Sequence, residues 1–390
     1  MNARHALFSG EMTPLPYRPP RLLLQWHVSD RCNLRCAHCY QDDYRDKGRG
    51  MADWLPILEQ FRAFLGGVQN PISGDAPSPI KGHITVTGGE PFTHPEFPAL
   101  LERLALLRKE FSFAILCNGT LIDEAMARQL AVWGPRFVQV SIEGSSATHD
   151  ALRGKGNHAA VVAGLKRLVA AGVRTLLAFT AHADNYREFP EVARLGRSLG
   201  VSRVWADRLI PQGRGGKLRG LSLEETRDFI ELMRQSKLQV ESKLGGRLRK
   251  GTEIAMHRAL QFLAGGPAYR CTAGDTLITV MPDGTLYPCR RLPISAGNLL
   301  QTPLATLYDG ALFRQLRNPE AVASGCEACV YERLCRGGLR CLSYAVTKQL
   351  RVADPGCWLA SVPVHTQLAA TAPAAATAPA PTAAPTAAAV

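Results

Sequence analysis

Three cysteines, Cys32, Cys36 and Cys39, form a Cys-x3-Cys-x2-Cys run near the N-terminus. Three thiolates in one short loop can bind three irons of a 4Fe–4S cube and leave the fourth iron open to a substrate or cofactor. A structural zinc site normally has a fourth Cys or His in matched pairs, and His38 is a poor co-ligand because it adjoins Cys39. The spacing therefore favours an open iron–sulfur cluster over zinc.

The elements that must position this loop alternate between apolar strands and amphipathic helices from residue 22 to about 207. The predicted strands are Leu22–Val28, His83–Thr87, Ser112–Cys117, Phe137–Ile142, Thr175–Thr180 and Arg203–Asp207. The predicted helices are Asp53–Leu65, Pro95–Lys109, Asp123–Trp133, Asn157–Ala171 and Tyr186–Leu199. Five helices linking six strands imply parallel crossovers, so we predict an α/β fold with a partial (β/α)6, TIM-like barrel. Two further repeats, which a full eight-stranded barrel would require, are not found.

Polar motifs lie where several of these strands end, which is the edge of a parallel barrel that collects reactive groups. The second strand is followed by Gly88, Gly89, Glu90 and Pro91, and glycines let backbone groups approach a ligand closely. The third strand ends at a turn that contains Asn118, and the fourth at Ser141 and Glu143. Arg153 lies in the next polar segment. The Trp205–Gly216 stretch is expected to line the mouth of the barrel.

The cysteine run, the Gly-Gly-Glu-Pro element and the later strand-end motifs together resemble the radical S-adenosylmethionine (SAM) enzyme family. The resemblance implies that Cys32, Cys36 and Cys39 hold a catalytic [4Fe-4S] cluster whose open iron chelates SAM. It also implies SAM contacts for the residues of these motifs: Tyr40, Gly88, Gly89, Glu90, Pro91, Asn118, Ser141, Glu143 and Arg153. For Arg153, a surface charge at a helix start is an equal alternative. Cys117 is expected to be a small buried strand residue.

Seven further cysteines lie between residues 271 and 357, and their spacing resembles the SPASM subgroup of the same family. That resemblance implies an outer auxiliary [4Fe-4S] cluster on Cys326, Cys329, Cys335 and Cys357. The inner auxiliary cluster, on Cys271 and Cys289, lacks a ligand because Leu339 occupies the expected position. Either Cys341 replaces it, or the inner cluster is open, smaller or absent. A zinc ribbon would account for Cys326 and Cys329 alone.

The chain is predicted to divide into an N-terminal extension (1–20), a radical SAM core (21–236), a bridge with a SPASM domain (237–361) and a disordered Ala/Pro/Thr-rich tail (362–390). A capping box of Ser222 and Glu225 predicts a helix to about Gln235, and a second helix is predicted near Thr252–Leu263. Gln69–Gly82 reads as a loop. We expect no leader-binding winged domain before the barrel.

Composition restricts location and partners. Eleven cysteines without an export signal indicate metal binding rather than disulfides, and no run is apolar enough to span a membrane, so we predict a cytoplasmic protein. The net charge of +13 suits an acidic partner, but no aromatic-interleaved basic patch indicates nucleic acid. The predicted partners are a peptide or small protein as substrate and an electron donor such as flavodoxin or ferredoxin.

Three functions remain open at this point. The first is a maturase that cleaves SAM to a 5′-deoxyadenosyl radical and modifies a peptide or small protein. The second is a tetrapyrrole-modifying relative, for instance in haem biosynthesis, because the segment from Tyr344 to Cys357 resembles both groups and a basic mouth suits propionates. The third is a non-catalytic iron–sulfur electron carrier, which would need no open iron.

Overall fold

The computed structural model describes residues 17–41, 43–45, 49–66, 79–242 and 251–361. The predicted disordered tail (362–390) and most of the predicted N-terminal extension lie outside these residues. The predicted loop Gln69–Gly82 also lies mostly outside them, and its last two residues belong to a strand rather than to the loop.

One curved sheet forms the centre of the described structure, with strand order β7-β6-β5-β4-β3-β2-β1-β8-β9. Neighbouring strands from β7 to β8 are parallel, and β9 alone is antiparallel. The strands are β1 (Arg21–His27), β2 (Lys81–Thr87), β3 (Phe111–Cys117), β4 (Val138–Ser141), β5 (Thr175–Ala181), β6 (Arg203–Arg208), β7 (Glu253–Ala255), β8 (Leu277–Val280) and β9 (Leu286–Tyr287). The six predicted strands of the α/β barrel are thus confirmed.

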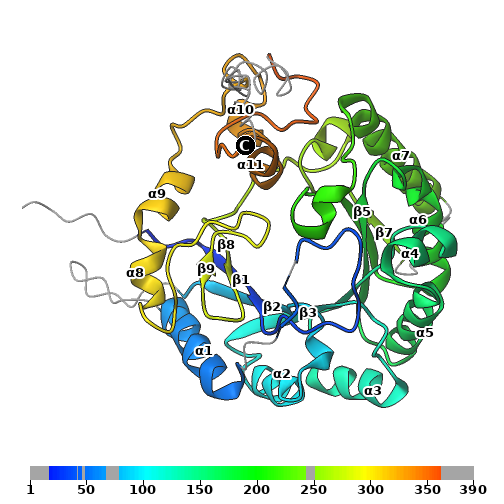
Figure 1. Ribbon diagram of the computed structural model, residues 1–390, viewed down its shortest axis with the longest axis vertical. Coiled ribbons are helices and arrows are strands. Elements are labelled where there is room, and N and C mark those ends of the chain that lie inside the picture. Colours follow the sequence, from blue (N-terminus) through cyan, green and yellow to red (C-terminus); the bar gives the residue numbers. More distant parts are fainter. Residues whose placement is uncertain (1–16, 42, 46–48, 67–78, 243–250, 362–390) are drawn as a thin grey trace, which may run out of the picture.

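The helices of the barrel cover the outside of this sheet (Figure 1). They are α1 (Met51–Gly66), α2 (Phe97–Leu106), α3 (Glu124–Trp133), α4 (Ser146–Arg153), α5 (Asn157–Ala170), α6 (Phe189–Leu199) and α7 (Leu223–Ser242). Short 3-10 turns precede or link them: η1 (Pro91–Thr93), η2 (Tyr186–Glu188), η3 (Gly213–Lys217) and η4 (Gln261–Ala264). The C-terminal region adds α8 (Leu304–Tyr308), α9 (Ala311–Arg317), α10 (Glu332–Cys335) and α11 (Arg340–Thr347).

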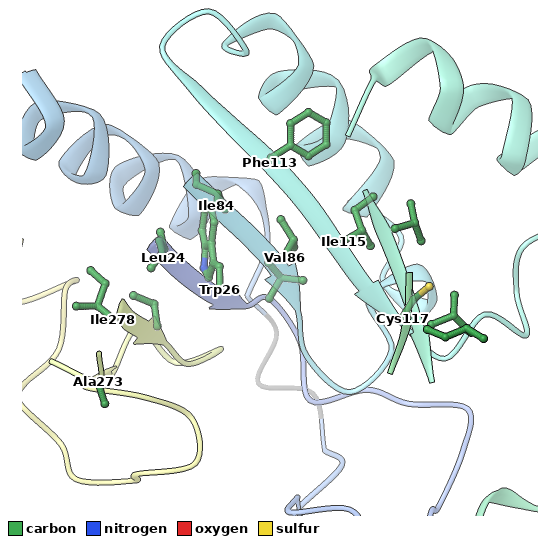
Figure 2. Close-up of a cluster of buried hydrophobic side chains, with 14 of the residues drawn as sticks. Leu24, Trp26, Ile84, Val86, Phe113, Ile115, Cys117, Ala273 and Ile278 are labelled. Atoms are coloured by element: carbon green, nitrogen blue, oxygen red, sulfur yellow. The ribbon is translucent and has the colours of Figure 1, made fainter. Parts of the chain in front are cut away.

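The two faces of the sheet differ in chemistry. Residues that alternate along each strand belong to the apolar core under the helices, among them Leu24, Ile84, Ile115 and Ile278 (Figure 2). The intervening residues face the inside of the curve, because side chains alternate with a period of two along a strand. Many of these inside positions are polar: Gln25, His27, Thr85, Thr87, Gln139, Ser141, Thr180, Asp207 and Thr279. Ala178, Trp205 and Ala255 form a small apolar cluster. A polar inside face indicates that the barrel accommodates a polar ligand rather than only a core.

Two expectations for the region after β6 had different outcomes. The capping box at the start of α7 is confirmed: the Glu225 amide donates to Ser222 Oγ (3.2 Å), and the Ser222 amide donates to Glu225 Oε2 (2.9 Å). The helix predicted near Thr252–Leu263 is wrong, because this segment contains strand β7 and only a 3-10 turn, η4. Pairing with the free edge of β6 supplies β7 with hydrogen bonds that the local sequence pattern does not reveal.

No helix among the described residues is both long and apolar enough to cross a membrane.

Candidate functional site

The N-terminal cysteines lie on one loop that begins directly after β1. The amides of Leu34 and Gln41 donate to the thiols of Cys32 and Cys39, each at 3.4 Å. Burial raises the pKa of Cys32 to about 11, and the charges of Cys36 and Cys39 add to that rise because all three thiols lie close together. The arrangement fits three thiolates around one cluster, whose assembly would displace their protons.

Gly88 and Gly89 bring this loop against the end of β2. The Gly89 amide donates to the Ser29 carbonyl (2.8 Å), and the Glu90 amide donates to the Arg31 carbonyl (2.7 Å). A Cβ on Gly88 would collide with the Ser29 carbonyl oxygen, and one on Gly89 with that of Arg31. The backbone of the cysteine loop therefore comes so close to Gly88 and Gly89 that these positions have no room for a Cβ.

Glu90 is completely buried behind this turn. It accepts hydrogen bonds from the amides of Asn118 (2.6 Å) and Phe92 (3.2 Å), and Pro91 begins η1 beside it. Burial raises its pKa to about 7, although the two amides oppose the shift. The Asn118 side chain in turn donates to Asn33 Oδ1 (2.8 Å) within the cysteine loop. Asn33, which no sequence motif singled out, thus links the loop to β3.

A second buried carboxylate, Glu143, lies after β4 and is held by the cysteine loop and α4. Arg153 donates to Glu143 Oε1 (2.6 Å), and His38 Nε2 lies 3.2 Å from the same oxygen. The amide of Thr180 donates to the other oxygen (2.9 Å). Burial alone would raise the pKa of Glu143, but His38 and Arg153 together lower it well below its usual range.

Arg153 is the last residue of α4 and lies beside the cysteines. Its side chain is 10% exposed, and its Nη1 is 3.8 Å from the Cys36 sulfur. The alternative that Arg153 is a surface charge at a helix start is therefore wrong. A buried guanidinium beside thiolates favours their negative charge.

The stretch after β6 also contacts the cysteine loop. The Gly215 amide donates to the Cys39 carbonyl (2.9 Å), and Arg214 Nε donates to the Cys36 carbonyl (3.2 Å). Tyr40 packs against Arg290, whose guanidinium carbon lies 4.8 Å from the ring centre. Ser141 ends β4 on the inside face, in register with Ala178 of β5. The loop is thus held by the ends of β2, β3, β4 and β6.

The outer cysteine set, Cys326, Cys329, Cys335 and Cys357, lines one pocket. Its other lining residues are apolar side chains from η4 and its flanks, together with Tyr331, Glu332 and Asp354. Burial raises the pKa values of Cys326 and Cys335 to about 12, with a further rise from the charge of Cys357. In the described parts of the chain, no three Cys, His, Asp or Glu side chains converge as a single-ion site requires. A pocket with four thiols on its wall fits a multi-iron cluster instead.

The inner cysteine set consists of Cys271, Cys289 and Cys341. Cys341 lies on α11 and is buried, and burial together with the charges of Cys289 and Cys271 raises its pKa well above the ordinary value. The three thiols are therefore neighbours. Leu339 is buried and donates its amide to Asp354 (3.0 Å), so this position is part of the protein interior. Cys117 lies apart from both sets, buried at the end of β3.

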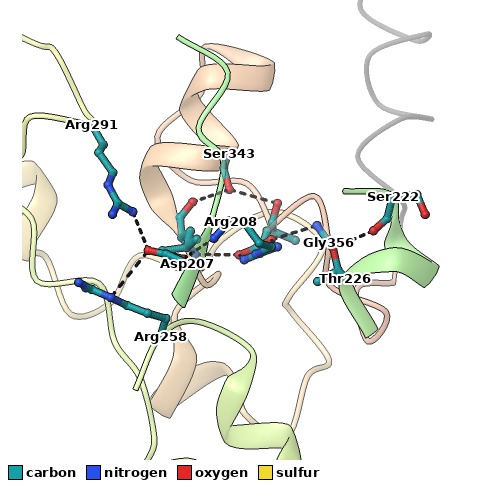
Figure 3. A network of polar contacts seen from close by, with 11 residues as sticks. Asp207, Arg208, Ser222, Thr226, Arg258, Arg291, Ser343 and Gly356 are labelled. Carbon is teal, nitrogen blue, oxygen red and sulfur yellow. Dashed lines mark hydrogen bonds and ion pairs between the residues drawn. The ribbon is translucent and has the colours of Figure 1, made fainter. Parts of the chain in front are cut away.

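Two adjacent residues at the end of β6, Asp207 and Arg208, form ion pairs with residues that lie beside the two cysteine sets (Figure 3). Asp207 is 2.6 Å from Arg291 and 3.7 Å from Arg258, which flank the inner set. Arg208 donates to both oxygens of Asp354 (2.7 and 2.6 Å), beside the outer set. Both lie in the stretch predicted to line the mouth of the barrel, but Arg291 and Asp354 are 84 and 146 positions away from them, so only the fold reveals these pairs.

Comparison with known proteins finds matches to two family models. Residues 26–196 match the radical SAM superfamily, and residues 271–330 match the iron–sulfur cluster-binding domain known as SPASM. The first match contains Cys32, Cys36 and Cys39, and the second contains Cys271, Cys289, Cys326 and Cys329.

The relatives have more than one activity. The AdoMet-dependent heme synthase of Methanosarcina barkeri is 26% identical over 87% of this chain and 96% of its own length. The mycofactocin maturase MftC of Mycobacterium ulcerans is 28% identical over 86% of this chain and 87% of its own. The fold is similar to that of Streptococcus suis SuiB bound to its precursor peptide SuiA, with a TM-score of 0.65 at 17% identity, over 88% of this chain and 76% of that one.

Proposed function

The chain is a radical SAM protein with a C-terminal SPASM domain, and we propose that it is an enzyme that modifies a peptide or small protein by radical chemistry. The observation that carries the proposal is the cysteine loop after β1, whose three thiols lie together and which is held by residues at the ends of β2, β3, β4 and β6. A loop fixed in this way can present an open iron in a constant orientation to the inside of the barrel.

In this proposal Cys32, Cys36 and Cys39 hold a [4Fe-4S] cluster. When reduced, the cluster would supply the electron for cleavage of SAM to methionine and a 5′-deoxyadenosyl radical, and this radical would abstract hydrogen from the substrate. Glu90 is buried next to Cys32 and would orient SAM through its amino group, since a carboxylate accepts hydrogen bonds from an amine. The charge of Arg153 favours the thiolate form of Cys36.

The remaining residues of the predicted SAM site surround this arrangement. We assign positioning or contact roles to Tyr40, which follows Cys39 on the cysteine loop, and to the residues at the ends of β2, β3 and β4: Gly88, Gly89, Pro91, Asn118, Ser141 and Glu143. Gly88, Gly89 and Asn118 would act on SAM through the loop that they position, because their closest partners are residues of the cysteine loop. Glu143 would hold Arg153 and His38 in place.

The C-terminal cysteines would carry auxiliary clusters. Cys326, Cys329, Cys335 and Cys357 suit a [4Fe-4S] cluster with four protein ligands. Cys271, Cys289 and Cys341 suit an inner cluster with three, in which Cys341 replaces the ligand missing at Leu339. We propose that these clusters conduct electrons between the substrate and a donor such as flavodoxin or ferredoxin. The proposed domain boundaries remain 21–236 for the core and 237–361 for the bridge and SPASM domain.

Two substrate classes are supported by relatives. MftC and the structural neighbour SuiB, which binds the precursor peptide SuiA, favour a peptide. The heme synthase and a pre-heme d1 synthase of Dinoroseobacter shibae, 27% identical over 89% of this chain, favour a tetrapyrrole as the second candidate. Both would require the polar inside face of the barrel.

The test is anaerobic incubation of the iron-loaded enzyme with SAM, a reductant and candidate substrates, followed by mass spectrometry. Short peptides encoded beside the gene form one arm and carboxylated porphyrins the other. The proposal predicts 5′-deoxyadenosine together with a mass change in a peptide. A mass change only in the porphyrin would replace the peptide with the second candidate, and no 5′-deoxyadenosine in either arm would overturn the radical chemistry.

A further inference from the structure

Three arginines near the inside of the barrel are each paired with a carboxylate, and a fourth is not. Arg153 pairs with Glu143, Arg208 with Asp354, and Arg291 with Asp207. Arg290, next in sequence to Cys289, is half-buried and is within ion-pairing distance of no carboxylate of the described residues. It contacts Tyr40, through the ring and the carbonyl oxygen (3.4 Å), and its Nε is buried without a hydrogen-bond partner.

The unpartnered part of Arg290 is its buried Nε. A polar atom that is removed from water is normally hydrogen-bonded, because leaving it unpaired costs free energy. A buried polar group without a partner needs a reason, and a ligand that completes the pair is one such reason. Arg290 therefore has an Nε donor without a partner, in a region where the neighbouring arginines are each paired with a carboxylate.

The surroundings of Arg290 show which space it faces. Its charge acts on His27, the last residue of β1 on the inside face, and on Tyr40, the residue after Cys39. Tyr40 also feels the charges of Cys39 and Cys289. Arg290 thus lies at the barrel interior between the catalytic cysteine loop and the inner cysteine set, where a substrate of the proposed reaction must sit.

His27 adds a second unused polar group. It is 3% exposed, and its Nε2 is buried without a hydrogen-bond partner. Burial and the neighbouring charge of Arg290 lower its pKa well below the ordinary value, so the imidazole is neutral. A neutral imidazole can still donate one hydrogen bond, and a carboxylate can accept from it and from a guanidinium at the same time.

Resting on the proposed function, we infer that Arg290, supported by His27, binds a carboxylate group of the substrate. The guanidinium fork matches a carboxylate in two-point geometry. This assigns the substrate class as a carboxylate-bearing molecule, either an acidic peptide or a porphyrin with propionate groups.

The two neighbouring cysteine sets are acted on most strongly by other arginines. The largest positive charges that act on Cys289 are those of Arg291 and Arg258, and the charge of Arg153 acts on Cys36. These three arginines also pair with Asp207 or Glu143. Arg290 differs from them because none of the described carboxylates lies within ion-pairing distance of it.

The experiment measures binding to the iron-loaded enzyme with SAM present, under anaerobic conditions and without reductant. One probe pair is a porphyrin with four free propionates and its methyl ester; the other is a blocked hexapeptide with two glutamates and its glutamine counterpart. Wild type should prefer the acid of at least one pair by roughly 10- to 100-fold, the range for a hydrogen bond to a charged group. Arg290→Gln should lose that preference, and Arg290→Lys should keep part of it.

The control is Arg128→Gln, the same chemical change at an α3 side chain that is 67% exposed, which should keep the full preference. The pair that shows the effect identifies the substrate type. Equal binding of acid and neutral probe by wild type in both pairs, or a full preference in Arg290→Gln, would overturn the inference. Equal weakening of SAM binding in Arg290→Gln would also overturn it, because Arg290 would then serve SAM. Failure of the proposed function is a separate result: wild type would form no 5′-deoxyadenosine, whereas the affinity ratios need no turnover.

Discussion

The outer and inner cysteine sets are built for different purposes although both lie in the SPASM region. The outer set contributes four thiols to the wall of one pocket, whose other lining residues are mainly apolar but include Glu332 and Asp354. The inner set contributes three thiols, and its surroundings are charged: Asp207, Arg258 and Arg291 lie beside it. The expected fourth ligand position holds Leu339, buried with its amide bonded to Asp354.

The two sets therefore differ in the number of thiols that they offer to a cluster. Four thiols leave no iron open to a further ligand, which suits a cluster that only transfers electrons. A three-thiol set next to the polar inside face resembles the catalytic loop, which also has three thiols and a paired arginine beside it. We expect mutations to separate the two sets cleanly.

The largest expected effect is on the outer set. In a variant with Cys32, Cys36 and Cys39 changed to Ala, two auxiliary cubes would leave about 8 Fe per chain. Adding Cys335→Ala together with Cys357→Ala should remove the outer cluster and reduce iron to about 4 per chain, because the two thiols that remain cannot hold a cube. Iron and sulfide analysis with EPR measures this. The matched control, Cys117→Ala, should retain all the iron, and an unchanged count after the loss of Cys335 and Cys357 would contradict the assignment of the outer cluster.

A smaller and more selective loss should follow from Cys341→Ala in the same triple-alanine background. Since Cys341 neighbours Cys271 and Cys289, its removal should convert or release the inner cluster while the EPR signal of the outer one persists. If neither the iron content nor the spectrum changes, Cys341 is no ligand, and the inner site holds fewer cysteines or no cluster.

The ion pair between Arg208 of β6 and Asp354, which lies beside the outer set, can be removed without changing a cysteine. Arg208→Met leaves Asp354 buried without its cation, which should lower the free energy of unfolding by about 3–5 kcal/mol. Arg203→Met on the same strand breaks an ion pair whose side chains are 32% and 46% exposed and should cost less than about 1 kcal/mol. Denaturant unfolding of both variants makes the comparison. Equal losses would mean that the buried pair does not secure the outer set.

The smallest expected effect is the pH dependence at Glu90. Its pKa is raised from 4.5 to about 7, so the stability contributed by the protonated form is present below pH 4.5 and lost as pH rises through about 7. Wild type should thus lose up to about 3 kcal/mol over this window, and Glu90→Gln should not. The affinity for SAM should change in the opposite sense and rise through pH 7 in wild type alone. Parallel profiles for the two proteins would refute this role of Glu90.

The strands that support the catalytic loop could be predicted because each combines several apolar or β-branched residues in a short segment with a polar motif at its end. β7 and β8 escaped prediction because they are short and pair with the edges of β6 and β1, far away in sequence. The same limit applies to the site. Cys32, Cys36 and Cys39 are recognisable from local spacing, and their roles stay predictions. Asp207, Arg208 and Arg290 carry no local signal, since their partners lie on other segments.

The glycines of the Gly-Gly-Glu-Pro element show a second limit. Sequence reasoning correctly predicted that a backbone must approach closely at Gly88 and Gly89, but assigned the approach to a ligand. The structure places the carbonyls of Ser29 and Arg31 there. Residue type indicates that space is needed, and only the fold tells which atoms use it.

The central claim is that the three-thiol loop after β1 is the catalytic centre, and Cys36→Ala tests it most directly. Wild type and the variant are incubated anaerobically with SAM and dithionite, and 5′-deoxyadenosine is quantified by liquid chromatography. We predict that wild type and Cys117→Ala form 5′-deoxyadenosine. Cys36→Ala should form none, because two thiolates cannot hold a cluster with an open iron, although it should keep its auxiliary iron. Unchanged formation of 5′-deoxyadenosine by Cys36→Ala would show that this loop is not the catalytic centre.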